Sequence, residues 1–229
     1  MTPKHHIVFL TGAGISQESG ISTFRDANGL WNNHKIEEVA SPEGFEKDPQ
    51  LVLDFYNARR RQLDEVAPNA AHRLIAQLET KYKITIITQN IDDLHESAGS
   101  TNVLHLHGEL RKSRSSKNPN LIYTCTQDIK LGDLASDGNQ LRPHIVWFGE
   151  AVTEIEKAIA ITQSADLFVI VGTSMVVHPA ASLLLAVPVD VQTVYIDNNP
   201  DVEEGINLLV IKEKATAGVR ILVEECLPY

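Results

Sequence analysis

The sequence is poor in cysteine, has no excess of basic residues and contains no long apolar run. Its two cysteines, Cys125 and Cys226, lie far apart, so neither a disulfide framework nor a four-cysteine zinc site can be built from them. Such sparse cysteine is typical of a reducing, cytosolic compartment. No apolar run reaches membrane-spanning length, and the first residues lack the charged-then-apolar pattern of a signal peptide. We therefore expect a cytoplasmic protein with no membrane partner.

Acidic residues outnumber basic ones, with 30 Asp and Glu against 20 Lys and Arg, and the formal net charge is −10. Binding to nucleic acid without regard to its sequence needs a basic surface, so no direct nucleic-acid binding is expected. The chain has 229 residues, 43% of them hydrophobic, which is enough to form a packed core. This composition favours one large globular domain, with or without a small insert.

The most informative stretch covers residues 7–16 and reads IVFLTGAGIS. A short apolar run that ends in glycines is typical of a strand buried on both faces of a parallel sheet. The glycines suit a tight turn whose backbone N–H groups approach a phosphate. The dinucleotide fingerprint is incomplete, because Gln17 stands where a third glycine or alanine is expected. From this stretch alone, a dinucleotide site and a turn that needs small residues for packing both remain open.

Strands and helices alternate along the rest of the chain. Apolar strands are predicted at 84–88, 102–107, 167–171, 191–196 and 208–211. Helices are predicted at 49–62, 68–80, 154–163, 179–186 and 216–226. This alternation predicts an α/β fold with a doubly wound, Rossmann-like parallel sheet. Polar clusters follow nearly every strand, and ligands of such sheets bind beyond the carboxyl ends of the strands, so the clusters are expected to meet at one site.

Taken in order, these clusters resemble those of the sirtuins, a family of NAD-dependent protein deacylases. The matching segments are GAGIS at 12–16, GISTFRD at 20–26, TQNID at 88–92, LHG at 106–108, VWFGE at 146–150 and GTS at 172–174. The resemblance implies one catalytic domain over residues 1–229. Its Rossmann-like part comprises about 1–40, 65–110 and 143–229, with a helical insert at about 41–64 and a small insert at about 111–142.

The resemblance implies that NAD is a consumed co-substrate and that the partners are acylated lysine side chains of proteins. In the family's reaction the acyl-lysine carbonyl oxygen attacks the nicotinamide ribose, nicotinamide leaves, and O-acyl-ADP-ribose is the product. By match to the motifs, His107 is the general base for a ribose hydroxyl, a task that suits a neutral imidazole near pH 7. Asn90 and Asp92 match catalytic residues that line the nicotinamide and ribose pocket. The alternative is local, with Asn90 and Asp92 capping a helix and His107 serving as a structural histidine.

The resemblance also assigns binding residues. It implies that the cofactor contacts the glycine turn, the loop after it and the segments after three later strands, which gives Gly12, Ala13, Gly14, Phe24, Arg25, Asp26, Gln89, Asn90, Ile91, Asp92, Gly172, Thr173, Ser174, Asp197 and Asn198. Asp197 departs from the family's usual asparagine, although a carboxylate still accepts protons from ribose hydroxyls. A strand edge that pairs with an extended substrate peptide is matched by Val146, Trp147, Phe148 and Gly149.

The largest departure from the family lies in the small insert, where two Cys-x-x-Cys pairs usually bind structural zinc. The expected neighbourhoods are occupied here by Ser113 to Ser116 and by residues 137–139, and only Cys125 is near. Serine hydroxyls are poor zinc ligands, so we predict no zinc and no other metal site.

Tyr56 and Arg59 are three residues apart on a predicted helix and therefore share a face. A phenol and a guanidinium together form a good carboxylate receptor. The pattern resembles that of class III sirtuins, which remove succinyl, malonyl or glutaryl groups as well as acetyl. The alternative is that Arg59 belongs to a solvated run of arginines and Tyr56 to the core.

The sequence also allows functions other than deacylation. An NAD-metabolite-binding module, or a protein ADP-ribosyltransferase with little deacylation, is compatible with the missing zinc cysteines. The presence of His107 and of the complete TQNID segment favours the deacylase. A hydride-transferring dehydrogenase fits less well, because the acidic residue expected after a second strand is absent.

Overall fold

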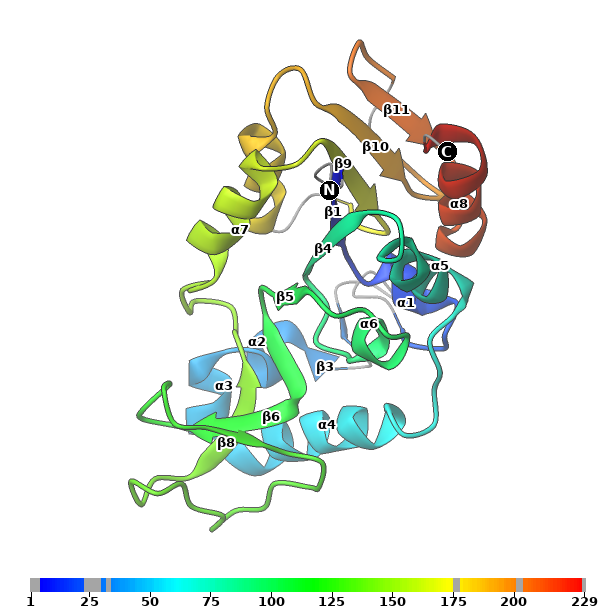
Figure 1. The fold of residues 1–229 in the computed structure, drawn as a ribbon. Coiled ribbons are helices and arrows are strands. Elements are labelled where there is room, and N and C mark those ends of the chain that lie inside the picture. The colour runs from blue at the N-terminus through cyan, green and yellow to red at the C-terminus, as the bar shows by residue number, and fades with distance from the viewer. Residues whose placement is uncertain (1–4, 23–29, 32–33, 175–177, 201–203, 228–229) are drawn as a thin grey trace.

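The computed structural model describes residues 5–22, 30–31, 34–174, 178–200 and 204–227. Its main feature is a parallel sheet (Figure 1) built from β1 His6–Thr11, β4 Lys83–Thr88, β5 Val103–His105, β9 Leu167–Val171, β10 Gln192–Ile196 and β11 Leu208–Ile211. The six strands follow the order β11-β10-β9-β1-β4-β5. The sheet extends from β1 in both directions, so the predicted doubly wound α/β fold is confirmed.

Strand β1 lies at the centre of the sheet because its run of apolar side chains tolerates burial on both faces. All of its residues are buried, and Leu10 pairs with Ile87 of β4 on one side and with Ile170 of β9 on the other. A continuous apolar strand of this kind is the signature of a parallel sheet covered by helices. The glycine turn that follows β1 is thereby held at the middle of the carboxyl edge.

Helices cover both faces of the sheet (Figure 1). On one face lie α5 Ala70–Leu78 and α8 Ala215–Ile221, and Ile75 and Val219 pack there in the same apolar cluster. On the other face lie α7 Ile155–Gln163 and the 3₁₀ helix Ala180–Ala186. Two short helices, α1 Gly14–Gln17 and α6 Leu94–Ser97, follow β1 and β4, and a π-helical turn, Leu222–Cys226, continues α8.

A second, smaller layer lies beyond the carboxyl edge (Figure 1) and begins with α2 Ile36–Val39, α3 Pro42–Lys47 and α4 Pro49–Gln62. The start of α3 is capped by Ser41, whose hydroxyl oxygen accepts from the Gly44 N–H at 2.9 Å. The start of α4 is capped by Asp48, whose carboxylate accepts from the Leu51 N–H at 3.0 Å. Each cap is followed by a proline, which suits the first turn of a helix.

The same layer contains an antiparallel sheet, in the order β7-β6-β8, of β6 Gly108–Ser115, β7 Ile122–Thr124 and β8 Leu141–Ile145. The sheet runs beyond the predicted insert 111–142 at both ends. A separate short pair, β2 Leu30–Trp31 and β3 His34–Lys35, lies near α4. Helix α4 holds the small sheet through Arg60, whose Nε donates to the Leu110 carbonyl at 2.7 Å.

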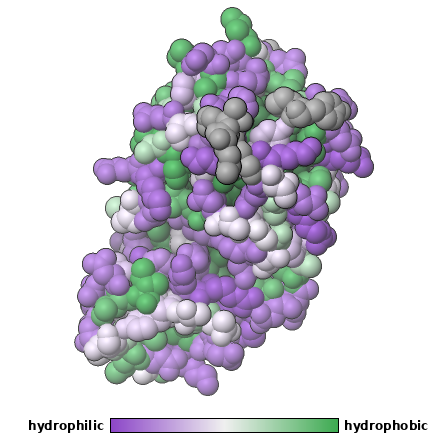
Figure 2. Space-filling model, in the orientation of Figure 1, coloured by the Kyte–Doolittle hydropathy of each residue, from purple (hydrophilic) through white to green (hydrophobic). Residues whose placement is uncertain are grey.

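The face shown in Figure 2 is predominantly hydrophilic, and its apolar side chains form small, separate groups. Among the described residues, no helix is both long enough and apolar enough to cross a bilayer.

Candidate functional site

A cavity of about 680 Å³ lies between the carboxyl edge of the large sheet and the smaller layer. Its walls come from the segments after β1, β4, β9 and β10, from α4, and from the segment after β8. A volume of this order is typical of cofactor and small-molecule sites. The cavity therefore stands where the sheet topology predicts a ligand.

The glycine turn at one end of the cavity is packed so closely that larger residues cannot replace it. The Gly14 N–H donates to the Gly172 carbonyl at 2.8 Å, and a Cβ on Gly14 would lie 2.6 Å from the Gly172 Cα. Gly172 itself has a φ of +62°, a left-handed conformation that favours glycine. Both turns thus need glycine for packing, and both leave backbone exposed to a ligand in the cavity.

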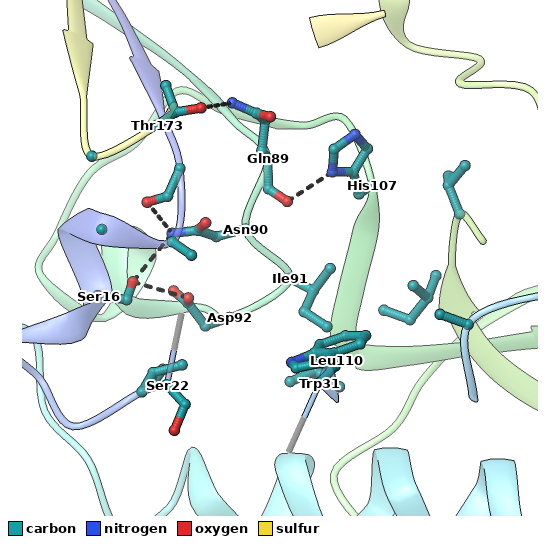
Figure 3. Close-up of a pocket in the computed structure, with 18 of the residues that line it drawn as sticks. Ser16, Ser22, Trp31, Gln89, Asn90, Ile91, Asp92, His107, Leu110 and Thr173 are labelled. Atoms are coloured by element: carbon teal, nitrogen blue, oxygen red, sulfur yellow. Dashed lines mark hydrogen bonds between the residues drawn. The ribbon is translucent and has the colours of Figure 1, made fainter. Parts of the chain in front are cut away.

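Ser16, Asn90 and Asp92 form a buried hydrogen-bonded group below this turn (Figure 3). The Ser16 hydroxyl donates to the Asp92 carboxylate at 3.0 Å and accepts from the Asn90 amide at 3.2 Å. The Asn90 amide also donates to the Gly12 carbonyl at 3.1 Å. Burial raises the pKa of Asp92 to about 6, although hydrogen bonds from Leu94 and Ser16 partly oppose the shift.

His107 lies on the cavity wall with one ring nitrogen engaged (Figure 3). Its Nδ1 donates to the Gln89 carbonyl at 3.0 Å, because a carbonyl can only accept. Nε2 is then the unprotonated nitrogen, and it has no hydrogen-bond partner among the described residues. Burial lowers the pKa of His107, so the ring is neutral at physiological pH and Nε2 can accept a proton.

His105 is the neighbour that sequence reasoning left without a role. Its Nδ1 donates to the Asn90 carbonyl at 2.9 Å, and its Nε2 lies 2.8 Å from the Glu96 carboxylate. Burial opposes the charged form, but the Glu96 carboxylate outweighs it and raises the pKa of His105. His105 therefore braces the segment that carries Asn90, whereas the Nε2 of His107 has no partner in the described part of the chain. The motif singles out His107 in the sequence, but the hydrogen bonds that make the two rings differ come from other segments of the chain and are not visible there.

Polar groups continue along the sheet edge toward β10. The Gln89 side-chain amide donates to the Thr173 hydroxyl at 2.9 Å (Figure 3), and the Tyr195 hydroxyl donates to the Thr173 carbonyl at 2.8 Å. Ser174, Asp197 and Asn198 line the same end of the cavity. This edge offers hydroxyl, amide and carboxylate groups to a ligand that begins at the glycine turn.

The opposite end of the cavity is lined by Tyr56 and Arg59 of α4 and by Trp147. The Arg59 Nη1 donates to the Phe55 carbonyl at 2.6 Å, and its Cζ lies 3.4 Å from the centroid of the Phe55 ring. Among the described residues no carboxylate pairs with Arg59, and its buried Nε has no hydrogen-bond partner. Burial lowers the pKa of Arg59 to about 10, so the guanidinium remains charged at neutral pH.

The segment 146–149 runs along the mouth of the cavity. The Val146 N–H donates to the His107 carbonyl, and the Phe148 N–H donates to the Ala40 carbonyl, each at 2.9 Å. Trp147 is 2% exposed and Phe148 is 49% exposed. Gly149 has a φ of +89°, a left-handed conformation that favours glycine, and it lines the cavity as well.

All of the predicted site residues that the structure describes line this one cavity: Gly12, Ala13, Gly14, Tyr56, Arg59, Gln89, Asn90, Ile91, Asp92, His107, Val146, Trp147, Phe148, Gly149, Gly172, Thr173, Ser174, Asp197 and Asn198. Phe24, Arg25 and Asp26 lie outside the described residues. Sequence reasoning assigned no role to Ser16, Trp31 or Leu110, which also line the cavity. The position of Ser16 next to the glycine turn is a sequence signal that could have identified it as a site residue. Trp31 and Leu110 give no such signal, because only the folding of the smaller layer places them at the cavity.

In the expected zinc neighbourhood of the small sheet, the polar side chains are hydrogen-bonded to other groups of the protein. The Ser115 hydroxyl donates to the Asp137 carboxylate at 2.7 Å and accepts from the backbone N–H groups of Lys117 and Asn118 at 3.1 Å. The Cys125 thiol donates to the Gln127 carbonyl at 3.3 Å. Within the described residues, no group of three His, Cys, Asp or Glu side chains is placed to hold a metal ion. The Ser115, Asp137 and Cys125 side chains form hydrogen bonds within the protein, and their arrangement does not fit a zinc ion.

The fold and the site together define a Rossmann-like α/β protein with a ligand cavity at the carboxyl edge of its sheet. More specifically, the chain belongs to the Sir2 family, whose model matches residues 12–179. The resemblance to sirtuins in the sequence is therefore confirmed at the level of the family.

Several known proteins are similar over most of the chain. An NAD-dependent protein deacylase of Helicobacter pylori is 60% identical over 192 residues, 84% of this chain and 84% of the relative. One of Bacteroides thetaiotaomicron is 52% identical over 230 residues, 97% of this chain and 98% of the relative. Among solved structures, a Sir2 homologue in complex with NAD has a TM-score of 0.85 and 39% identity, covering 96% of this chain and 88% of that one. A Sir2 protein with a p53 peptide and NAD⁺ has a TM-score of 0.81 and 33% identity, covering 97% and 93%.

Proposed function

We propose that the protein is an NAD-dependent deacylase of protein lysines that yields nicotinamide and O-acyl-ADP-ribose, and that it accepts acyl groups ending in a carboxylate as well as acetyl. The observation that carries this proposal is His107, a neutral ring whose free Nε2 shares one cavity with the glycine turn and with the Asn90–Asp92 group. The names of the Helicobacter and Bacteroides relatives and the ligands of the solved Sir2 structures support it.

The residues at the sheet edge fit a dinucleotide. Gly12, Gly14 and Gly172 line the cavity and let the two turns pack closely together at its wall, and Gln89 and Thr173 add polar side chains beside them. NAD, once bound there, supplies the ribose carbon that receives the acyl oxygen as nicotinamide departs. The Asn90 carboxamide and the buried Asp92 carboxyl line the same cavity, and because the Asn90 amide nitrogen donates to Gly12 and Ser16, these side chains offer oxygen acceptors to the amide of nicotinamide.

His107 acts as the general base in this proposal. Its Nε2 takes a proton from a ribose hydroxyl, while the hydrogen bond from Nδ1 to the Gln89 carbonyl fixes the tautomer and the orientation of the ring. Because burial lowers the pKa of His107, the base is available over the whole neutral range.

Peptide binding is assigned to the segment 146–149, which borders the cavity and directly follows β8, an edge strand of the small sheet. An extended peptide that pairs with this edge places its modified lysine into the cavity beside Phe148. The net charge of −10 is compatible with basic, lysine-containing peptides.

The acyl preference rests on Tyr56 and Arg59. A charged guanidinium with no carboxylate partner among the described residues, on the wall of the cavity, is a receptor for an anionic acyl tail. A charge-assisted hydrogen bond contributes about 1.5–3 kcal/mol, which corresponds to roughly tenfold to a hundredfold in selectivity.

The test compares matched acetyl-lysine and succinyl-lysine peptides by mass spectrometry, with and without NAD, for the wild-type protein, His107→Ala and Arg59→Met. We expect NAD-dependent loss of both acyl groups in the wild type and of neither in His107→Ala. Arg59→Met should lose at least tenfold in desuccinylation and much less in deacetylation.

Equal losses on both peptides in Arg59→Met would remove the acyl proposal and leave the deacylase. No turnover of either peptide by a wild-type protein that still binds NAD would favour the metabolite-binding module. Transfer of ADP-ribose to the peptide would favour the ADP-ribosyltransferase.

A further inference from the structure

Trp147 is buried at the junction between the small sheet and the acyl end of the cavity, and its indole nitrogen makes a specific contact. The Nε1–H donates to the Tyr56 hydroxyl oxygen at 3.1 Å, and the two rings lie 6.4 Å apart with an interplanar angle of 34°. An indole N–H can only donate, so the direction of this bond is fixed. Tyr56 therefore serves as the acceptor.

The direction of this bond leaves the hydrogen of the Tyr56 hydroxyl available for a second hydrogen bond. Tyr56 is fully buried, and among the described residues its hydroxyl oxygen has no hydrogen-bond partner other than Trp147. With one lone pair occupied by the indole, the O–H hydrogen remains for an acceptor in the cavity that Tyr56 and Arg59 both line. Burial raises the pKa of Tyr56, so the phenol keeps that hydrogen.

Trp147 is itself held from the small sheet. The guanidinium of Arg142 lies 3.2 Å from the centroid of the Trp147 ring, and Arg142 donates to the Glu150 carboxylate at 2.7 and 3.0 Å. The same carboxylate accepts from the Trp147 backbone N–H at 2.8 Å and from Arg114 at 3.0 and 3.1 Å. Burial opposes the charge of Glu150, but the Arg142 guanidinium outweighs it and lowers the pKa of this carboxyl. The indole is thus fixed through both its ring and its backbone.

We propose that Trp147 is a specificity-determining residue, which acts through Tyr56 by aiming its O–H at the carboxylate of an acyl tail beside Arg59. The proposal rests on the acyl preference proposed above. Trp147 is a positioning residue in this role, because its indole nitrogen contacts the phenol and not the acyl group.

The test is a double-mutant cycle with Trp147→Phe and Tyr56→Phe, each of which keeps an aromatic ring and removes one partner of the hydrogen bond. The readout is the ratio of kcat/KM for succinyl-lysine to kcat/KM for acetyl-lysine peptides. We expect Tyr56→Phe to lower this ratio about tenfold or more, because it removes a hydrogen bond to a carboxylate, and Trp147→Phe to lower it about two- to tenfold, because it removes a neutral hydrogen bond. The double variant should show the same ratio as Tyr56→Phe alone, because Trp147 acts through Tyr56.

Tyr123→Phe is the matched control, since it removes a phenol of the small sheet outside the cavity and should leave the ratio unchanged. Thermal unfolding shows which variants are folded, and Trp147→Leu replaces Trp147→Phe in the cycle if the latter is not. An unchanged ratio in the folded Trp147 variant, or additive effects in the double variant, would overturn the proposal. A wild-type protein without desuccinylase activity would instead overturn the acyl preference, so the two failures are distinguishable.

Discussion

Asp92 carries its carboxyl group at a buried position, where ionisation is unfavourable. Its pKa rises from 3.8 to about 6, so the folded state binds a proton more tightly than the unfolded chain does. The stability linked to this proton is fully present below about pH 4 and is lost as the pH rises through about 6. At neutral pH the protein therefore retains a destabilising charge at its site, a common property of functional groups.

Asp92→Asn should stabilise the protein at pH 8 by about 2–3 kcal/mol and abolish most of the deacylation. The stabilisation should shrink as the pH is lowered to 4.5, because the wild-type carboxyl is then protonated. Urea unfolding at the two pH values measures it. The same stability difference at both values would show that ionisation of Asp92 is not its cause.

The position of the proton on the His107 ring depends on groups outside its own motif. The motif identified the residue, but the choice of Nε2 as the free nitrogen depends on the Gln89 carbonyl, which β4 and its following loop bring to Nδ1. His105, two positions earlier, has both nitrogens engaged, by Asn90 and Glu96. The chemical difference between the two rings is therefore a property of their neighbours.

At the scale of elements, α4 serves both as a wall of the cavity and as the support of the small sheet. The Asn57 side chain donates to the Ile129 carbonyl at 2.8 Å and accepts from the Ile129 N–H at 2.9 Å. Beside it, Arg60 donates to the Leu110 carbonyl and to Asn57 Oδ1. These buried side chains connect the helix to the insert for which no zinc is predicted.

Asn57→Ala should destabilise the protein by about 1–3 kcal/mol, because the N–H and carbonyl groups of Ile129 lose their partner at a buried position. Amide hydrogen exchange followed by mass spectrometry should show lost protection around residue 129. Asn139→Ala, on a half-buried bend of the same insert, is the control and should change stability by less than about 0.5 kcal/mol. Equal losses of stability in the two variants would contradict the role of α4 as the support of the insert.

Most elements were predictable, and the exceptions have physical reasons. The Ser41 and Asp48 caps and the buried strands follow from local side-chain chemistry and periodicity. The predicted helix at 179–186 is a 3₁₀ helix, and the one at 216–226 ends in a π-helical turn, because packing against the sheet overrides local preference there. The small sheet was not predicted as a sheet, since its strands are polar and pair only through contacts between distant segments.

At the scale of the whole molecule, the two layers are held together by packing and hydrogen bonds, and the donors around Ser115 and Asp137 do not fit a metal. Treatment of the purified protein with EDTA should therefore leave its melting temperature unchanged, and metal analysis should find far less than one equivalent of zinc. Cys125→Ser should have little effect, because the thiol makes only a weak hydrogen bond to the Gln127 carbonyl. One equivalent of bound zinc, or a large fall in melting temperature with EDTA, would refute this prediction.

The amino-acid sequence by itself determined the α/β class, the central strand, the glycine turns and the family, because these depend on periodicity, residue size and ordered motifs. It also named most of the cavity's residues. Only the tertiary structure decided which histidine nitrogen is free, that the Asp92 carboxyl is buried, and that the Trp147 indole holds the Tyr56 phenol. The reason is that each of these properties arises between groups far apart in the sequence, where no local pattern records the distance or the solvent exposure.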